Sequence, residues 1–152
     1  MLGLLFIVIG IPIIILLTPY WIVIIPIDCY KKIKFEKKYK TFLIENHGKN
    51  FFCYNNRKNS QNFIEDNIIP NLNDKIDIVF LNGKIIETEF NSEFVSAALY
   101  KSKNYNRFPH LIKIRNGKLI DKSINNPFYN VLNLNKSQPE LLNQINRFFD
   151  LS

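Results

Sequence analysis

Cysteine and histidine, the side chains best suited to redox, nucleophilic or zinc chemistry, are few and scattered in this sequence. The chain of 152 residues contains two cysteines, Cys29 and Cys53, and two histidines, His47 and His110. Structural zinc sites need cysteine or histidine pairs at short spacings, and no such pair occurs. The chain also lacks a phosphate-binding loop, a dinucleotide fingerprint and a G-x-S-x-G elbow. The sequence therefore predicts no metal site, no cofactor and no catalytic residue, and it favours a protein that is not an enzyme.

The two cysteines have different surroundings. Cys53 lies in the apolar run Phe51-Phe52-Cys53-Tyr54, where a buried thiol behaves as a small apolar residue. Cys29 stands between an apolar segment and a cluster of lysines. Palmitoylation is one alternative for such a thiol, but an unmodified cytosolic thiol is favoured. A disulfide is not expected from two cysteines placed in this way.

The spacing of apolar residues predicts several helices. The first covers 30–47, and Gly48 is a suitable C-cap. The second begins at Ser60 as its N-cap and reaches about Leu72. A third covers 92–101. The chain closes with a helix after the capping box Ser137-x-x-Glu140.

Short apolar runs between these helices predict four strands. Two of them cover 51–54 and 76–81. Asn116-Gly117 is a strong two-residue hairpin signal, and it predicts that a strand over 108–114 turns back as a strand over 118–123. Strands that alternate with helices form parallel crossovers, and the hairpin adds an antiparallel edge. The expected fold is α/β, a mixed four-stranded sheet with flanking helices.

This order of elements, with Pro109 opening the third strand and Asn116-Gly117 joining it to the fourth, resembles the thioredoxin-like fold. The resemblance covers about Lys49 to Leu151 and depends on element order plus one short motif. In that family this strand opens with a cis-proline beside the active site, so the resemblance implies a cis bond before Pro109. His110 would then lie near the former active-site loop.

The chain departs from the family in its chemistry. Thioredoxins use Cys-x-x-Cys between the first strand and the next helix, where the helix dipole activates the thiolate. The corresponding segment here, 55–60, contains no sulfur, and a serine such as Ser60 needs a base before it can attack. The resemblance therefore implies a redox-inactive domain with a groove for a peptide or protein. The candidate contact residues are Asn55, Asn56, Arg57, Lys58, Ser60, Phe108, Pro109 and His110.

Two other functions stay open at this stage. One is a glutathione-dependent or other thiol-cofactor enzyme on the same fold, with Ser60, Asn55 or Tyr54 holding the thiol. In that case Arg57 and Lys58 would pair with the carboxylates of the cofactor. The other is a structural subunit of a membrane complex.

The N-terminal segment predicts a membrane anchor. Residues 1–27 contain no Asp, Glu, Lys, Arg or His. The uncharged stretch from Leu2 to Ile27 exceeds the roughly 20 residues that cross a hydrocarbon core. A cleaved signal peptide is disfavoured because no basic residue precedes the apolar run and no small-residue cleavage site follows it. The expected domains are a transmembrane anchor over 1–27, a basic juxtamembrane segment over 28–48 and the thioredoxin-like domain over 49–152.

Prolines recur every seven residues in this segment, at Pro12, Pro19 and Pro26. A single kinked span is favoured, since transmembrane helices tolerate proline. The alternative is a hairpin that turns near Thr18-Pro19 and returns to the same face.

The basic residues that follow predict the orientation. The segment 28–40 has six lysines against Asp28 and Glu36, a net +4 out of +7 for the whole chain. Positive flanks stay in the cytoplasm, so the N-terminus is expected outside and the domain inside, in a single-pass protein. The membrane-surface lysines are Lys31, Lys32, Lys34, Lys37, Lys38 and Lys40. The expected partners are the bilayer, its anionic headgroups and another protein, and nucleic acid is not expected because the basic stripe is confined to the membrane edge.

Overall fold

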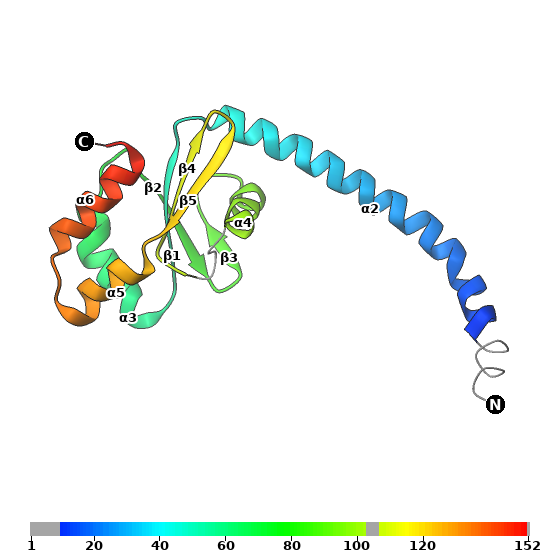
Figure 1. Ribbon diagram of the computed structural model, residues 1–152, viewed down its shortest axis with the longest axis horizontal. Coiled ribbons are helices and arrows are strands. Elements are labelled where there is room, and N and C mark those ends of the chain that lie inside the picture. The colour runs from blue at the N-terminus through cyan, green and yellow to red at the C-terminus, as the bar shows by residue number, and fades with distance from the viewer. Residues whose placement is uncertain (1–9, 103–106, 152) are drawn as a thin grey trace. The chain divides into compact units, whose positions relative to one another are not determined.

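The computed structural model describes residues 10–102 and 107–151, and it divides into two compact units (Figure 1). The first unit is Met1–Lys40, of which residues 10–40 are described. The second unit is Thr41–Ser152.

The described part of the first unit is helical. Helix α2 (Ile11–Glu45) runs through Pro19 and Pro26 and ends just inside the second unit. Because α2 is continuous at Thr18-Pro19, the alternative of a hairpin turning there is wrong. The predicted anchor Leu2–Ile27 falls partly on residues 1–9, which lie outside the described residues. Within residues 10–102 and 107–151, no helix combines the length and apolar character that a membrane span requires.

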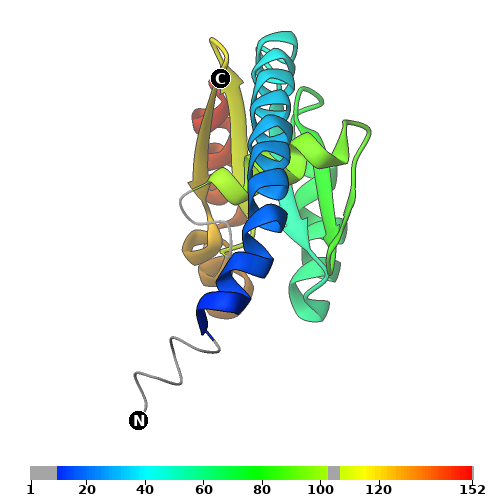
Figure 2. The same cartoon turned by 90° about the vertical axis from the view of Figure 1, so that its right-hand side faces the viewer.

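The second unit contains a mixed sheet with the strand order β3-β2-β1-β4-β5 in its described part. The strands are β1 (Asn50–Asn55), β2 (Asp77–Asn82), β3 (Ile85–Glu87), β4 (His110–Arg115) and β5 (Lys118–Ser123). Strands β1 and β2 are parallel, while the pairs β1–β4, β4–β5 and β2–β3 are antiparallel. Figure 2 shows the β4–β5 hairpin at one side of the sheet and the β2–β3 hairpin at the other.

The prediction of four strands is wrong, because β3 adds a fifth. Strand β2 ends at Asn82, close to the end of the predicted strand over 76–81, but the chain turns there and pairs again. Asn82 pairs with Ile85, which leaves Gly83 and Lys84 as a two-residue turn. Gly83 has φ +64°, a left-handed conformation that glycine adopts without a steric penalty. The short β3 lacks an alternating apolar pattern of useful length, so sequence periodicity could not reveal it.

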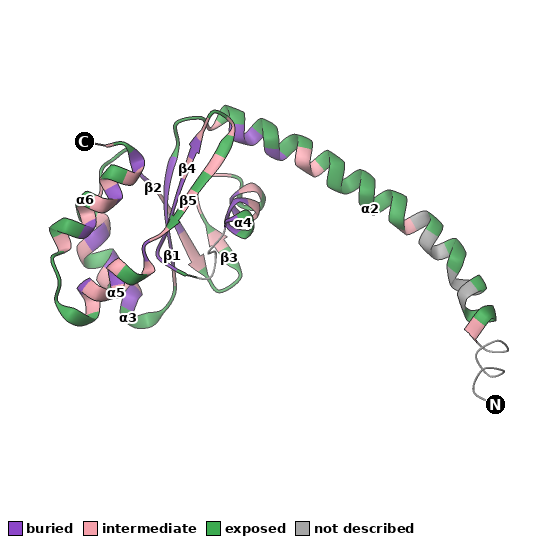
Figure 3. Ribbon diagram, viewed as in Figure 1, coloured by how far each residue is buried: buried purple, intermediate pink, exposed green. Residues whose placement is uncertain are grey.

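Helices cover both faces of the sheet, as the sequence predicted. They are α3 (Lys58–Phe63), followed by η2 (Ile64–Ile68) and η3 (Ile69–Asn71), then α4 (Ser92–Lys101), α5 (Asn125–Leu134) and α6 (Gln138–Phe149). Figure 1 shows α3, α5 and α6 on one face and α4 on the other. The first face buries Phe52 and Leu111 against Phe128 and Ile145, all with no measurable exposure. Figure 3 colours stretches of β1, β4, α5 and α6 as buried. This cluster is the main apolar core of the unit.

Two helices show how the ends are fixed. Helix α4 begins after Asn91, whose side chain accepts hydrogen bonds from the backbone N–H groups of Glu93 and Phe94. Helix α6 begins after Ser137, whose hydroxyl accepts from the N–H of Glu140, as the capping box predicted. Helix α5 was not predicted.

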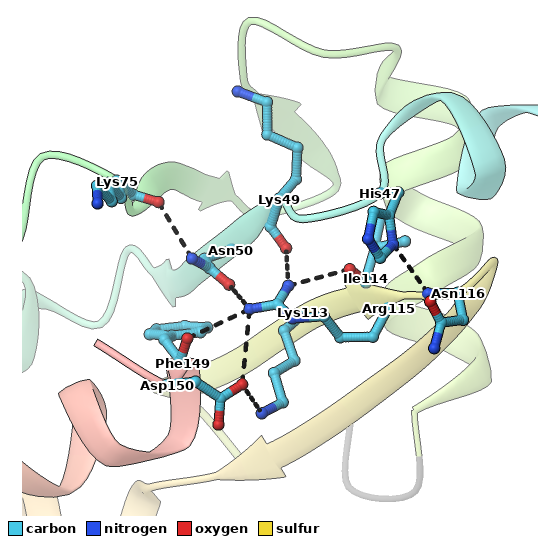
Figure 4. A network of polar contacts seen from close by, with 10 residues as sticks. All are labelled: His47, Lys49, Asn50, Lys75, Lys113, Ile114, Arg115, Asn116, Phe149 and Asp150. Atoms are coloured by element: carbon cyan, nitrogen blue, oxygen red, sulfur yellow. Dashed lines mark hydrogen bonds and ion pairs between the residues drawn. The ribbon is translucent and has the colours of Figure 1, made fainter. Parts of the chain in front are cut away.

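Arg115, at the end of β4, joins three parts of the second unit (Figure 4). Its guanidinium donates to the side chain of Asn50 at 2.8 Å, to the carbonyl of Lys49 at 3.3 Å and to the carbonyl of Phe149 at 3.2 Å. The last carbonyl belongs to the C-terminal turn of α6, where a cation also complements the helix dipole. Arg115 therefore fixes α6 to the sheet.

Candidate functional site

The predicted contact residues come from two segments that the sheet brings to one end. Strands β1 and β2 are parallel and finish there, and β4 starts there. Cys53 pairs with His110, so the antiparallel register carries Asn55 toward Phe108. The carboxyl ends of parallel strands are the usual place for ligand sites in open α/β sheets. The structure thus brings the segments 55–60 and 108–110 to the same end of the sheet.

The first segment connects β1 to α3. The backbone N–H of Asn56 donates to the carbonyl of Leu81, and its side chain donates to Asn82, so this residue faces the end of β2. Arg57 and Lys58 are exposed and available to a partner. Their charges are the main electrostatic feature of this segment.

The prediction that Ser60 is an N-cap is wrong. The N-cap of helix α3 is Arg57, three residues earlier, and it makes no side-chain capping bond. Ser60 lies inside the helix, 4% exposed, and its hydroxyl donates to the carbonyl of Arg57 at 3.0 Å. This back-bond to the preceding turn is a common alternative for serine inside helices. Ser60 is therefore a buried structural residue of this end.

The second segment leads into β4 and is held by the end of β5 and the start of α5. The Phe108–Pro109 peptide bond is cis, as the resemblance implied. Ser123 donates its hydroxyl to the carbonyl of Arg107 at 2.8 Å. Ile124 donates its N–H to the carbonyl of Pro109 at 3.1 Å, and Asn125 donates its side-chain amide to the carbonyl of Phe108. Phe108 and Pro109 are both buried.

His110 is fully buried beside this segment. Its Nε2 lies 3.2 Å from an Oδ atom of Asp121, and its Nδ1 makes no hydrogen bond of ordinary geometry. Burial lowers the pKa of His110 below its usual range, although the Asp121 carboxylate and the carbonyl of Arg107 favour the charged ring. The neutral imidazole then carries its hydrogen on Nε2, and this N–H donates a hydrogen bond to the carboxylate of Asp121.

A hollow of about 320 Å³ lies next to this segment. It is lined by Arg107, Asp121, Lys122, Ser123, Asn126 and Pro127. Arg107 and Lys122 are exposed cations, while Asp121 is half-buried and already bonded to His110. The hollow is therefore polar and offers two positive groups to a ligand.

Potential nucleophiles at this end are withdrawn from solvent. Cys53 has no measurable exposure, and burial raises the pKa of its thiol. Burial and the hydrogen bond from its hydroxyl to Glu65 raise the pKa of Tyr54. In the described ranges 10–102 and 107–151, no group of three or more His, Cys, Asp or Glu side chains could hold a metal ion.

The sequence interpretation missed Arg107, Asp121, Lys122 and Asn125, although a signal for Asp121 was present. A two-residue turn at Asn116-Gly117 fixes the register of the hairpin. Counting back from the turn pairs His110 with Ser123. Asp121 then stands diagonally across from His110 on the same face, within reach of its ring.

The predicted membrane-surface lysines all lie on α2 in the first unit. Each of Lys31, Lys32, Lys34, Lys37, Lys38 and Lys40 is exposed. The other cysteine, Cys29, is an exposed free thiol on the same helix. Their role at a membrane stays a prediction.

Comparison of the chain with protein families, with curated proteins and with solved structures yields no match.

Proposed function

We propose that this protein is a membrane-held binding module in which a thioredoxin-like, redox-inactive domain contacts an extended segment of another protein. Attachment is assigned to Leu2–Ile27 and to the lysines of 31–40, and the domain then lies on the cytoplasmic side. The binding site is the end of the sheet formed by residues 55–58, Arg107 to Pro109 and the hollow at Lys122.

The family assignment in this proposal is supported by the arrangement of four of the strands. Strand β2 lies parallel to β1 on one side, and the β4–β5 hairpin lies antiparallel on the other. The element order strand, helix, strand, helix, hairpin, helix agrees with the resemblance seen in the sequence. Strand β3 and helix α5 are additions to that order.

One observation favours binding over catalysis. At this end of the sheet the side chains of Cys53, His110 and Ser60 are buried, while charged groups suited to recognition are exposed. Cys53 and His110 have no measurable exposure, and Ser60 is 4% exposed. Covalent catalysis needs an activated nucleophile that can reach its substrate. The groups open to solvent are instead Arg57, Lys58 and Arg107, three cations that can pair with an acidic partner.

The attachment part of the proposal is supported by charge distribution. The segment 2–27 carries no charged residue, and the next thirteen residues carry a net charge of +4 from six lysines against Asp28 and Glu36. Such lysines are attracted to anionic headgroups by about 1 kcal/mol each near the surface.

A selection of displayed random peptides on the full chain in mild detergent tests the binding function. We expect enrichment of extended peptides, and we expect hydrogen exchange to slow in residues 55–60 or 107–126 when an enriched peptide binds. A Lys136→Glu variant, changed at an exposed residue outside these segments, should bind the same peptides equally well. Absence of enrichment, or protection confined to α6, would contradict the proposal.

A further inference from the structure

Strand β5 is an open edge of the sheet whose hydrogen-bonding groups can be assigned. The turn residues Asn116 and Gly117 have φ of +51° and +67°, as a type I′ two-residue hairpin requires. In such a hairpin the residues flanking the turn exchange both backbone hydrogen bonds, so Lys118 is bonded to Arg115. The pattern then alternates along the strand. The N–H and C=O groups of Leu119, Asp121 and Ser123 therefore point away from the sheet.

Hydrogen bonds elsewhere on β4 agree with this assignment. Ile114 exchanges backbone hydrogen bonds with Gly48 and Lys49, on the side of β1, so its groups do not face β5. Just beyond the other end of β5, the N–H of Ile124 donates to the carbonyl of Pro109. The even-numbered residues of this segment therefore bond to β4 and the residue before it. The outward direction of the odd-numbered residues is thus fixed from both ends of the strand.

This outward row is unoccupied by the described part of the chain. Within residues 10–102 and 107–151, no backbone hydrogen bond is made by the outward groups of Leu119, Asp121 or Ser123. The side chains of β5 alternate between the two faces of the sheet. One face carries the exposed side chains of Lys118, Ile120 and Lys122, and Ile120 is 42% exposed. The edge thus presents a positive, an apolar and a positive side chain at alternate positions.

The charges near this edge favour an acidic segment over a second copy of β5. Lys118, Lys122 and the nearby Arg107 are three cations, and the carboxylate of Asp121 is already bonded to His110. A second copy of β5 added in antiparallel orientation about Ile120 would place Lys118 opposite Lys122, and like charges directly opposite destabilise a sheet. A segment with acidic residues at those positions would instead form two favourable cross-strand pairs.

We propose that β5 binds, as an added strand, an extended segment of the partner protein with the pattern acidic–x–apolar–x–acidic. The main chain of the segment bonds to the outward groups of Leu119 and Asp121. Its apolar side chain covers Ile120, and its two acidic side chains pair with Lys118 and Lys122. An acidic residue beyond Lys122 enters the hollow beside Arg107. This inference rests on the proposed binding function and names the chemistry of the partner.

The test uses the full chain and a displayed library of peptides of about nine residues, with threonine fixed at alternate positions to favour extended conformations. We expect the unmodified protein to enrich acidic residues on both sides of a central Val, Ile or Leu. The double variant Lys118→Glu with Lys122→Glu should reverse the preference to Lys and Arg at the same positions. A peptide selected on the unmodified protein should bind this double variant about tenfold more weakly, because two attractive cross-strand charge pairs become repulsive.

A second variant tests whether the outward backbone groups of β5 form hydrogen bonds with the peptide. Leu119→Pro removes an outward N–H without removing a bond to β4, and edge strands accept proline where the N–H faces solvent. We expect it to weaken binding of the selected peptide about fivefold, the effect of one hydrogen bond. Ser92→Pro, at the first residue of α4, is the matched control and should bind as before, because proline is accepted there.

The outcomes separate the two proposals. If peptides are enriched but bind both β5 variants unchanged, the lysines serve only to discourage edge-to-edge aggregation. That result overturns the inference about β5 and leaves the binding function in place. If no peptide is enriched on any form of the protein, the proposed function itself fails, and the inference about β5 falls with it.

Discussion

The Nε2 atom of His110 lies 3.2 Å from an Oδ atom of Asp121, a contact that joins β4 to β5 beneath the candidate site. Burial nevertheless lowers the pKa of His110, so the folded state keeps the ring neutral at pH values where a free histidine is charged. Below about pH 6.5 the unfolded chain therefore takes up a proton that the folded chain does not. The free energy of unfolding should decrease as the pH falls from 6.5, until the pH passes below the folded pKa.

This pH dependence is measurable by urea unfolding of the full chain in mild detergent at pH 7.5 and 5.5. We expect His110 to account for a loss of at most about 1.4 kcal/mol over that interval, the limit for a ring that stays neutral in the folded chain throughout. His110→Gln keeps a side-chain N–H for Asp121 and should remove this part of the loss. His47 is present in both forms and cancels in the comparison. An equal loss in the variant would show that folding does not change the pKa of His110, and it would contradict this prediction.

The second prediction concerns the bonds from Arg115 to Asn50 and to the carbonyl of Phe149. Arg115→Met keeps most of the aliphatic stem but leaves the buried amide oxygen of Asn50 and the C-terminal turn of α6 without their donor. We expect the free energy of unfolding to fall by about 2 kcal/mol, since buried acceptors lose their partner. Arg147→Met on the exposed side of α6 is the control and should change it by less than about 0.5 kcal/mol. Equal effects of the two substitutions would contradict the role given to Arg115.

The cap of α4 gives the third prediction. Asn91 accepts hydrogen bonds from the N–H groups of Glu93 and Phe94 at 3.1 and 3.2 Å. Replacing it by alanine should lower the free energy of unfolding by about 1 kcal/mol. Asn91→Asp keeps an acceptor and adds a negative charge at the helix N-terminus, so it should match or exceed the stability of the unmodified protein. Thermal unfolding of the three forms decides this, and an aspartate variant as weak as the alanine variant would rule out the cap.

Where patterns were local and strong, the sequence predicted the fold well. Asn116-Gly117 identified the β4–β5 hairpin, and Ser137 identified the start of α6. Helix α4 begins and ends at the predicted residues, Ser92 and Lys101. In each case the side chains that define the element are close in sequence, so local physical chemistry decides the outcome.

Helix α5 was not predicted because its sequence has only a weak local preference for helix. It begins Asn125-Asn126-Pro127, and asparagine has weak helix propensity. Proline is accepted in the first turn, and burial of Phe128 and Val131 against the sheet stabilises the rest. That burial depends on β1 and β4, which are distant in sequence. A long-range contact therefore overrides a weak local preference.

The candidate site was predicted in position but not in composition. The resemblance to the thioredoxin-like fold implied that 55–60 and 108–110 lie at one end of the sheet, and the register confirms that they do. The contact of Phe108 with Asn125 could not be predicted, because Asn125 is the first residue of the unpredicted helix α5. Likewise, Ser60 is buried because the helix starts three residues earlier than an N-cap at Ser60 would imply.

The last prediction concerns the six exposed lysines of α2, at 31, 32, 34, 37, 38 and 40. Replacing all six by glutamine leaves Leu2–Ile27 unchanged but removes the positive charge that would draw the chain to an anionic surface. During cell-free synthesis, flotation would measure how fast the chain associates with vesicles of phosphatidylcholine containing about 30% phosphatidylserine. We expect the variant to associate several-fold more slowly at low salt, and the difference to shrink at about 1 M salt because charges are screened. Vesicles of phosphatidylcholine alone should show no difference between the two forms. Equal rates on anionic vesicles at low salt would mean that these lysines do not contact the membrane surface.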